Sequence, residues 1–274
     1  MDDLGFEITD AIEWFVPDME NPFVLVRVRE EHARTWIEVL FSPFRRCYIT
    51  DEVLCDRTTQ VAEECGQPAE KLRAQILESK LPDPGSTMAG DFGELLVYLY
   101  QAAKEHPRLA FGPKKWRLKQ DRTKPAPRSD VIHFVLPSWP QPSEEDTILC
   151  AEVKTKATNG ASHPISEAIT DCAKDRVSRL AATLVWLRER ALGESLGAVE
   201  IAHLNRFINA TDYPPVIKRF RAVAVICSSL IDGELQEAPA EKPQDYELVV
   251  ISIPNLRELY MSIFEAVRKS ADSL

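Results

Sequence analysis

Three segments between residues 90 and 156 carry the pattern that decides the fold. They read GDFGELLVYLYQ (90–101), RSDVIHFVL (128–136) and DTILCAEVKTK (146–156). The first is apolar around most of a helical circumference and predicts a buried helix over residues 92–104. The other two are rich in β-branched and aromatic residues and predict strands. The last is apolar at nearly every position, which indicates a central place in a sheet.

Each apolar segment also contains a charged residue. Glu94 falls in the first turn of the expected helix, either as a buried carboxylate or in a capping arrangement with Asp91, the expected N-cap. Asp130 opens the first strand. Glu152 and Lys154 close the second strand on one face, because strand side chains alternate. Asp130 and Glu152 meet if the two strands pair as a hairpin in adjacent registers.

This arrangement of charges is typical of a metal-dependent nuclease. Hydrolysis of a phosphodiester needs a hydroxide and a counter-charge, and Mg²⁺ (or Mn²⁺) supplies both through oxygen ligands. Asp130 and Glu152 are the candidate metal ligands, with Glu94 as a third, either direct or through water. Lys154 can orient or deprotonate the attacking water, or neutralise charge on the phosphate. A Glu-X-Lys triplet alone is a weak signal, and the upstream Asp and helical Glu strengthen it.

Size and composition place the chain among ordinary globular proteins. It has 274 residues, 45% apolar and 28% charged, which is enough for a large core without disulfides. It has no apolar run of the length that spans a membrane. The acidic start, MDDLGFEITD, does not resemble a signal peptide, so we expect a cytoplasmic protein. No cysteine pair has zinc-site spacing, and Cys150 and Cys227 lie in strand patterns as expected buried thiols.

The charge is unevenly distributed along the chain. Its net value is −10, from 33 basic and 43 acidic residues, which argues against a general nucleic-acid coat protein. Residues 108–128 nevertheless hold eight basic residues and one acidic residue. This segment is a candidate phosphate-binding surface beside the carboxylates, although a solvated loop and strand face has the same composition. The candidate DNA-binding residues are Lys114, Lys115, Arg117, Lys119, Arg122, Lys124 and Arg128.

The flanking segments predict a mixed architecture. Before residue 90 we expect a strand at 23–28, a strand or short helix at 36–41, two helical pieces within 57–80 and a loop at 81–89. Residues 114–120 alternate and predict a half-exposed strand. After residue 156 we expect helices at 165–191, 195–210 and 255–270, strands at 221–227 and 246–253, and a loop at 232–245. The fold class is therefore α/β or α+β.

The long helix at 165–191 has a clear apolar stripe. Its members recur at helical spacing and include Val177, so that residue is expected to face the core. The opposite, wet face is expected to hold Asp171, Lys174, Asp175 and Arg179.

The sequence resembles the DUF1837 family, the nuclease subunit (HamA) of the Hachiman anti-phage defence system. The resemblance lies in Gly93-Glu94-Leu95-Leu96, in Ser129-Asp130-Val131-Ile132-His133 and in Ala151-Glu152-Val153-Lys154, and it covers residues 90–180. It implies a divergent PD-(D/E)XK nuclease, with a restriction-endonuclease-like core at 81–274 in which helices flank a mixed central sheet. Residues 1–80 would be an N-terminal mixed α/β extension packed on that core.

The resemblance also assigns roles to individual residues. Asp130, Glu152 and Lys154 match the catalytic triad of the family, and Glu94 matches its helix glutamate. Glycines often flank the Ser-Asp pair in the family, where this chain has Arg128 and Val131, so the loop around Asp130 is less permissive.

A partner is implied as well. Family members act with a superfamily 2 DNA helicase (HamB-like), which forms a heterodimer with the nuclease, holds it quiet and releases it when DNA is damaged or invaded. The N-terminal aromatic residues Trp14, Phe15, Phe23 and Trp36 are candidates for that interface, with an ordinary core as the alternative.

Two other functions fit the same residues. A nuclease-like module could regulate a helicase without cutting, or the chain could be a repair or restriction nuclease. The intact set of Asp130, Glu152 and Lys154 favours a DNase, because a silent fold has no physical need for converging charges. His133, on the opposite strand face from Asp130, is expected to be a core or supporting histidine.

The net charge predicts weak DNA binding by the isolated chain, because phosphate is repelled by most of the surface. A fluorescence-anisotropy titration with duplex DNA at about 150 mM salt should give a Kd weaker than ~1 μM, in the range of non-specific binding. Tight binding under these conditions would contradict the idea that a partner delivers the substrate.

Overall fold

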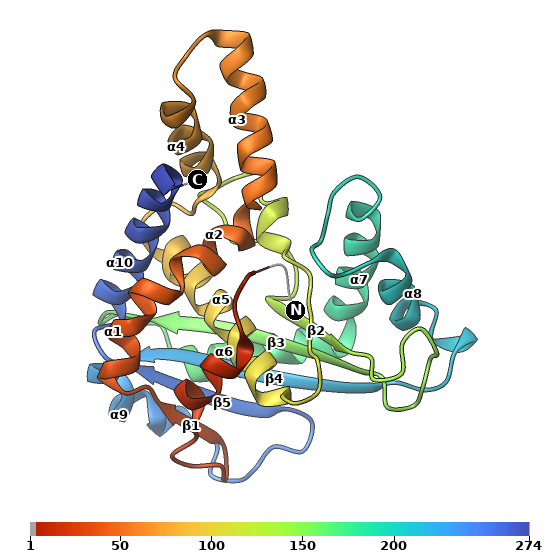
Figure 1. Cartoon of the computed structure of the whole chain (residues 1–274). Coiled ribbons are helices and arrows are strands. Elements are labelled where there is room, and N and C mark those ends of the chain that lie inside the picture. The colour runs from red at the N-terminus through yellow and green to blue at the C-terminus, as the bar shows by residue number, and fades with distance from the viewer. Residues whose placement is uncertain (1–3, 274) are drawn as a thin grey trace.

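A mixed five-stranded sheet forms the centre of the fold (Figure 1). The computed structural model describes residues 4–273. Within them the strand order is β1-β5-β4-β3-β2, and all neighbours are parallel except the antiparallel pair β2 and β3. This is the mixed α/β architecture expected from the sequence. The strands are β1 (Val24–Arg27), β2 (Val131–Val135), β3 (Thr147–Lys156), β4 (Ile217–Cys227) and β5 (Glu247–Ile253).

The β2–β3 hairpin has the register that the sequence predicted. Val131 lies opposite Ala151, so Asp130 falls beside Glu152. Strand β4 pairs with β3 along its whole length, from Thr147 to Lys156. Since β2 begins only at Val131, residues 152–156 of β3 have a strand partner on the β4 side and extend beyond β2 on the other.

Helix α5 (Ser86–Glu105) crosses one face of the sheet and is longer than expected. The predicted loop 81–89 ends early, because Met88 and Ala89 continue the buried apolar face. Asp91 is therefore inside the helix and buried, and the prediction that it is the N-cap is wrong. Glu94 consequently lies beyond the first turn, so the capping alternative for Glu94 is wrong too.

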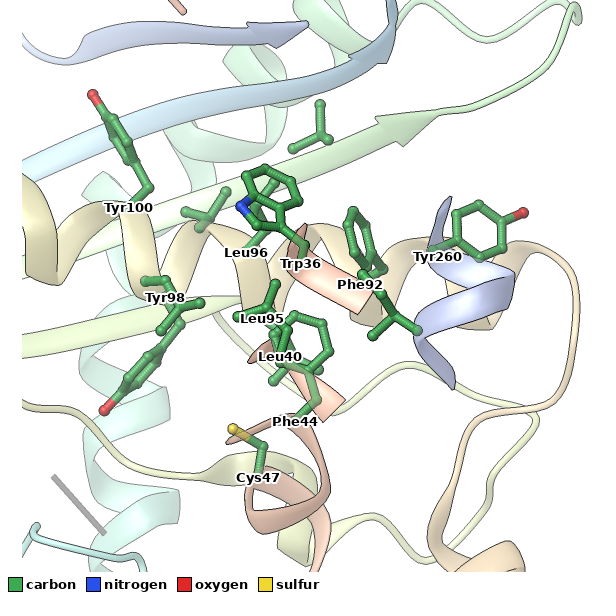
Figure 2. Packing of buried hydrophobic residues seen from close by; sticks show 14 of the residues in the cluster. Trp36, Leu40, Phe44, Cys47, Phe92, Leu95, Leu96, Tyr98, Tyr100 and Tyr260 are labelled. Atoms are coloured by element: carbon green, nitrogen blue, oxygen red, sulfur yellow. The ribbon is translucent and has the colours of Figure 1, made fainter. Parts of the chain in front are cut away.

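The N-terminal helices pack on α5 from outside. Helices α1 (Glu30–Val39) and α2 (Phe41–Tyr48), with Leu40 between them, bring Trp36 and Phe44 into one core cluster with Phe92 of α5, as Figure 2 shows. The strand alternative for residues 36–41 is thus wrong and the helical one is right. Strand β1 belongs to the central sheet. Trp14, Phe15, Phe23 and Trp36 are all buried, so they belong to the core and not to an exposed interface.

The other face of the sheet is covered by one long helical run. Helix α6 (Pro164–Lys174) passes through a π-helical turn (Asp175–Arg179) into α7 (Leu180–Arg190), which confirms the predicted helix. The predicted apolar and wet faces of this helix are wrong at the π-helical turn, because Val177 is 85% exposed and Asp175 is only 2% exposed. A π turn adds a residue and so rotates the following side chains by about 100°.

The remaining elements lie around this core. Helices α3 (Asp51–Cys65) and α4 (Ala69–Lys80) form a hairpin that projects from the body (Figure 1), broken near Gly66 as expected. The predicted strand at 114–120 is wrong, because residues Lys115–Leu118 form a buried 3-10 helix. The other helices are α8 (Ile201–Ile208), α9 (Ile231–Glu234) at the start of the expected loop 232–245, and α10 (Leu256–Lys269). Further 3-10 helices span Ile8–Phe15, Ala210–Asp212, Ser228–Leu230, Leu235–Glu237 and Ser270–Ser273.

Two further sequence expectations concern burial and membranes. Cys150 and Cys227 are buried thiols, as predicted. Over residues 4–273, no helix combines the length and the apolar character that crossing a bilayer requires.

Gly93 sets how closely α5 approaches β3. A Cβ atom at this position would lie 2.1 Å from Thr155 Oγ1 and 3.3 Å from Val153 Cγ1. We predict that Gly93→Ala lowers the free energy of unfolding by about 1–3 kcal/mol, since β-branched neighbours cannot easily move away. Urea unfolding would measure this. Gly90→Ala in the same helix, with open space around its Cβ, is the control and should be neutral or stabilising by up to about 1 kcal/mol. Equal effects of the two substitutions would contradict the close approach.

Candidate functional site

Two carboxylates meet at the open end of the β2–β3 hairpin. Glu152 is 2% exposed; its Oε1 accepts a hydrogen bond from Lys154 Nζ at 2.9 Å and its Oε2 one from Arg179 Nη2 at 2.5 Å. Asp130 accepts a hydrogen bond from the backbone N–H of Val153 at 2.8 Å. The Asp130 side chain is 15% exposed, so this carboxylate has access to solvent while Glu152 is enclosed.

Lys154 is held between two acids. Its ammonium group lies 2.6 Å from Asp171 Oδ2 on α6 in addition to its contact with Glu152. Burial alone would lower the pKa of Lys154, but the hydrogen bonds to Asp171 and Glu152 outweigh burial and raise it. Burial alone would raise the pKa of Asp171, but its hydrogen bonds to Lys154 and Lys174 lower this pKa to about 2. These contacts favour the ammonium form of Lys154.

The π-helical turn brings a fourth acid and an arginine to the same place. Arg179 donates to both oxygens of Asp175 at 2.7 Å. Ser129 Oγ donates to Asp175 Oδ1 at 2.6 Å, and Ser129 is also within hydrogen-bonding distance of Thr183 at 3.0 Å. Arg128, just before this serine, has φ +78°, a conformation that glycine adopts freely and other residues rarely do.

Glu94 approaches Asp130 from the α5 side of the sheet, opposite to Arg179. It accepts a hydrogen bond from Trp116 Nε1 at 3.0 Å, and Lys115 Nζ lies 3.3 Å from its carboxylate. The same ammonium donates to the backbone carbonyl of Ser129 at 2.8 Å and lies 3.9 Å from Asp130 Oδ1. Lys115 thus connects the helix glutamate to the start of β2.

Burial and like charge raise the pKa of both glutamates. Burial raises the pKa of Glu152 to about 8, with the negative charge of Asp130 acting in the same direction. Lys154 and Arg179 act in the opposite direction but do not cancel this increase. Burial also raises the pKa of Glu94 well above its usual range. Lys115 lowers this pKa, and Asp130 raises it. Asp130 is thus a near neighbour of both glutamates.

The donor atoms of this site suit a hard cation. Within residues 4–273, no three His, Cys, Asp or Glu side chains are arranged to hold a metal ion. Asp130 and Glu152 still provide an oxygen-only pair, and Mg²⁺ binds through one or two carboxylates with waters completing its shell. Each carboxylate oxygen has two acceptor positions, so Lys154 and Arg179 leave one free on each Glu152 oxygen.

The acidic and basic side chains of the site form one connected cluster. Five carboxylates are connected to three cations, apart from the exposed Lys174. The carboxylates are Glu94, Asp130, Glu152, Asp171 and Asp175, and the cations are Lys115, Lys154 and Arg179.

Three lysines of the basic segment do not reach the surface. Lys114 donates to Tyr98, Lys115 contacts Glu94, and Lys119 Nζ lies 2.8 Å from Asp91 Oδ2. All three side chains are enclosed, so the prediction that they form a DNA-binding surface is wrong for this structure. The alternating pattern of residues 114–120 suggested a half-exposed strand, but these lysine side chains are enclosed and pair inside the protein.

The other basic residues are more accessible. Arg117 donates to the backbone carbonyl of Arg46, and Arg122 pairs with Glu78 and Asp83. Lys124 and Arg128 are exposed. A cavity of about 1080 Å³ beside this segment is bordered by Arg117, Lys119 and the α3–α4 hairpin, away from Asp130 and Glu152. DNA contact by Arg117, Arg122, Lys124 and Arg128 stays a prediction.

Sequence reasoning missed several residues of the site. Asp171, Asp175 and Arg179 were expected on a wet helix face, although their spacing of four residues does put them in one row. Ser129 belongs to the Ser129-Asp130 motif, but nothing in the sequence indicates its hydrogen bond to Asp175. His133 is buried near Gln101, and burial, with Lys114 and Arg221 adding to it, lowers its pKa. It is a core histidine, as the sequence indicated.

The fold and site define a mixed α/β protein with acidic residues and a lysine at the end of an antiparallel hairpin. The HamA family model matches residues 12–267, so the chain belongs to the HamA family, and it is a component of a Hachiman defence system. A search of curated proteins found no match.

The raised pKa of Glu152 predicts how stability depends on pH. In metal-free protein the folded state keeps a proton that the unfolded chain loses above its ordinary pKa of 4.5, so stability falls as pH rises from about 5 to 8. Glu152→Gln should remove this loss, on the order of 4 kcal/mol between pH 5 and pH 8.5. Urea unfolding in EDTA at both pH values measures it. Glu144→Gln, an exposed neighbour, is the control, and an unchanged pH dependence in Glu152→Gln would refute the assignment.

Proposed function

We propose that this protein is a metal-dependent DNase, with a PD-(D/E)XK-like core, that serves as the effector of its defence system under the control of a superfamily 2 DNA helicase. The observation that carries the proposal is the meeting of Asp130 and Glu152 at one hairpin end, with Lys154 on the same strand face as Glu152. A mixed sheet flanked by helices, which the family resemblance implies, supports the same conclusion.

Each residue has a distinct role in this proposal. Asp130 and Glu152 hold the metal, and Glu94 sets the position of Lys115 behind Asp130. Bound Mg²⁺, or Mn²⁺ in its place, supplies an activated water and positive charge for the transition state. Lys154, with its raised pKa, acts as a cation that orients the phosphate or the water. General-base catalysis by Lys154 would require a lowered pKa and is therefore disfavoured.

Delivery of the substrate falls to the partner. The net charge of −10 opposes DNA binding, and the accessible cations nearest in sequence to Asp130 are Arg128 and Lys124. A helicase that already holds DNA would overcome this repulsion by raising the local concentration of the substrate. The same dependence would keep the nuclease quiet in the absence of its target.

A second function has its own support. Both oxygens of Glu152 bond to cations of the chain itself, Lys154 and Arg179. A carboxylate whose two oxygens both bond to the chain's own cations also suits a nuclease-like module that regulates the helicase without cutting DNA. Cleavage assays distinguish the two proposals.

The test is cleavage of supercoiled plasmid in Mg²⁺. We expect wild-type protein to cut with the helicase partner and ATP, and Glu152→Gln and Lys154→Ala each to reduce the rate at least ~100-fold, as loss of a charge-stabilising group does. Gel electrophoresis of nicked and linear products measures the rate. EDTA should abolish it.

Matched variants control for surface charge. Glu144→Gln and Lys218→Ala change exposed residues of the same types and should cut at the wild-type rate. No cutting by wild type under any condition, together with tight binding to the helicase, would replace the DNase proposal with the regulatory one.

A further inference from the structure

The π-helical turn Asp175–Arg179 links the two candidate metal ligands through side chains that have no role in the proposal above. We propose that Asp175 and Arg179 are positioning residues, which hold Glu152 and the Ser129–Asp130 segment in one fixed relation. The part of this inference that concerns metal binding rests on the proposed function.

A continuous chain of hydrogen bonds runs through this turn. It starts at Ser129 Oγ, which donates to Asp175 Oδ1 at 2.6 Å. Asp175 accepts two bonds from Arg179 at 2.7 Å, and Arg179 Nη2 donates to Glu152 Oε2 at 2.5 Å. The same Nη2 also donates to the backbone carbonyl of Asp171 at 2.8 Å. One end of the chain is therefore next to Asp130 and the other is Glu152 itself.

The π-helical turn brings Asp175 and Arg179 to the positions from which they make these contacts. Asp175 follows the buried residue Cys172 of α6 by three positions, so regular helical spacing places it toward the buried face and Val177 away from it. The π turn keeps Asp175 buried and Val177 85% exposed, and it lets the buried face resume at Leu180, five residues after Asp175. Single π-helical turns inside α-helices are rare and occur frequently at functional sites.

The chemistry of the pair favours positioning over simple charge balance. Arginine presents its donors in a rigid planar fork, so it can fix Asp175 and Glu152 together, which a lysine cannot. Replacing Arg179 by lysine keeps the positive charge and removes the fork. Any change in metal affinity in Arg179→Lys therefore reports on geometry rather than on electrostatics.

The matched control is Arg176, in the same turn. It pairs with Asp245 at the surface and has no hydrogen bond or ion pair to Glu152 among the described contacts. Isothermal titration of the full chain with Mn²⁺ should give Arg179→Lys and Asp175→Asn a Kd about 10–100-fold weaker than wild type, as for other groups that orient metal ligands. Arg176→Lys should remain within about twofold of wild type. Circular dichroism confirms that each variant is folded.

A metal-free experiment decides the inference separately from the proposed function. In a double-mutant cycle of Ser129→Ala and Arg179→Lys in EDTA, the unfolding equilibrium constants should be coupled by at least about threefold, because the two side chains act through Asp175. Additive effects would overturn the positioning role, and so would wild-type or tighter Mn²⁺ binding by Arg179→Lys. Wild-type protein that binds no Mn²⁺ would count against the proposed metal-dependent DNase, and the cycle would then decide the positioning role alone.

Discussion

The structure depends on keeping ionised side chains where water is largely excluded. A buried carboxylate is tolerated only when cations or hydrogen-bond donors replace its hydration. At the end of the β2–β3 hairpin, Lys115, Lys154 and Arg179 contact acids that come from α5, β3 and the α6–α7 run and offset part of their lost hydration. Elements far apart in the sequence are thereby tied together by charge. Apolar packing alone would leave their relative positions less well specified.

The two faces of the sheet contribute differently to this arrangement. On the α5 side, the close contact at Gly93 fixes the distance between helix and sheet and so the depth of Glu94. On the α6 side, Arg179 and Asp171 reach Glu152 and Lys154. Asp130 lies at the sheet edge, where β3 extends beyond β2, and is therefore influenced from both sides. For a HamA-family protein, this means that a change on either face can alter the candidate site.

The sequence predicted those parts that follow from simple periodicity. The β2–β3 hairpin, and with it the pairing of Asp130 with Glu152, follows from two apolar runs that end in charges. The 3-10 helix at Lys115–Leu118 could not be predicted, because buried lysines alternate with apolar residues just as exposed ones do. The part that Asp175 and Arg179 play in the site could not be predicted for another reason. A helical projection assumes a constant turn, and the π-helical turn breaks that spacing at residues 175–179, while Leu180, Leu184 and Leu187 beyond it remain buried as the stripe predicts.

The distance along the chain between the parts of the site has a consequence during synthesis. Domains fold as the chain emerges from the ribosome, N-terminal parts first. Glu94, Asp130, Glu152 and Lys154 are made early, but Arg179 follows Glu152 by 27 residues. Strand β4, which pairs with β3 along its full length, begins only at Ile217. A truncated or unfinished chain therefore contains the acidic residues without the elements that align them, and only the nearly complete product can assemble the site.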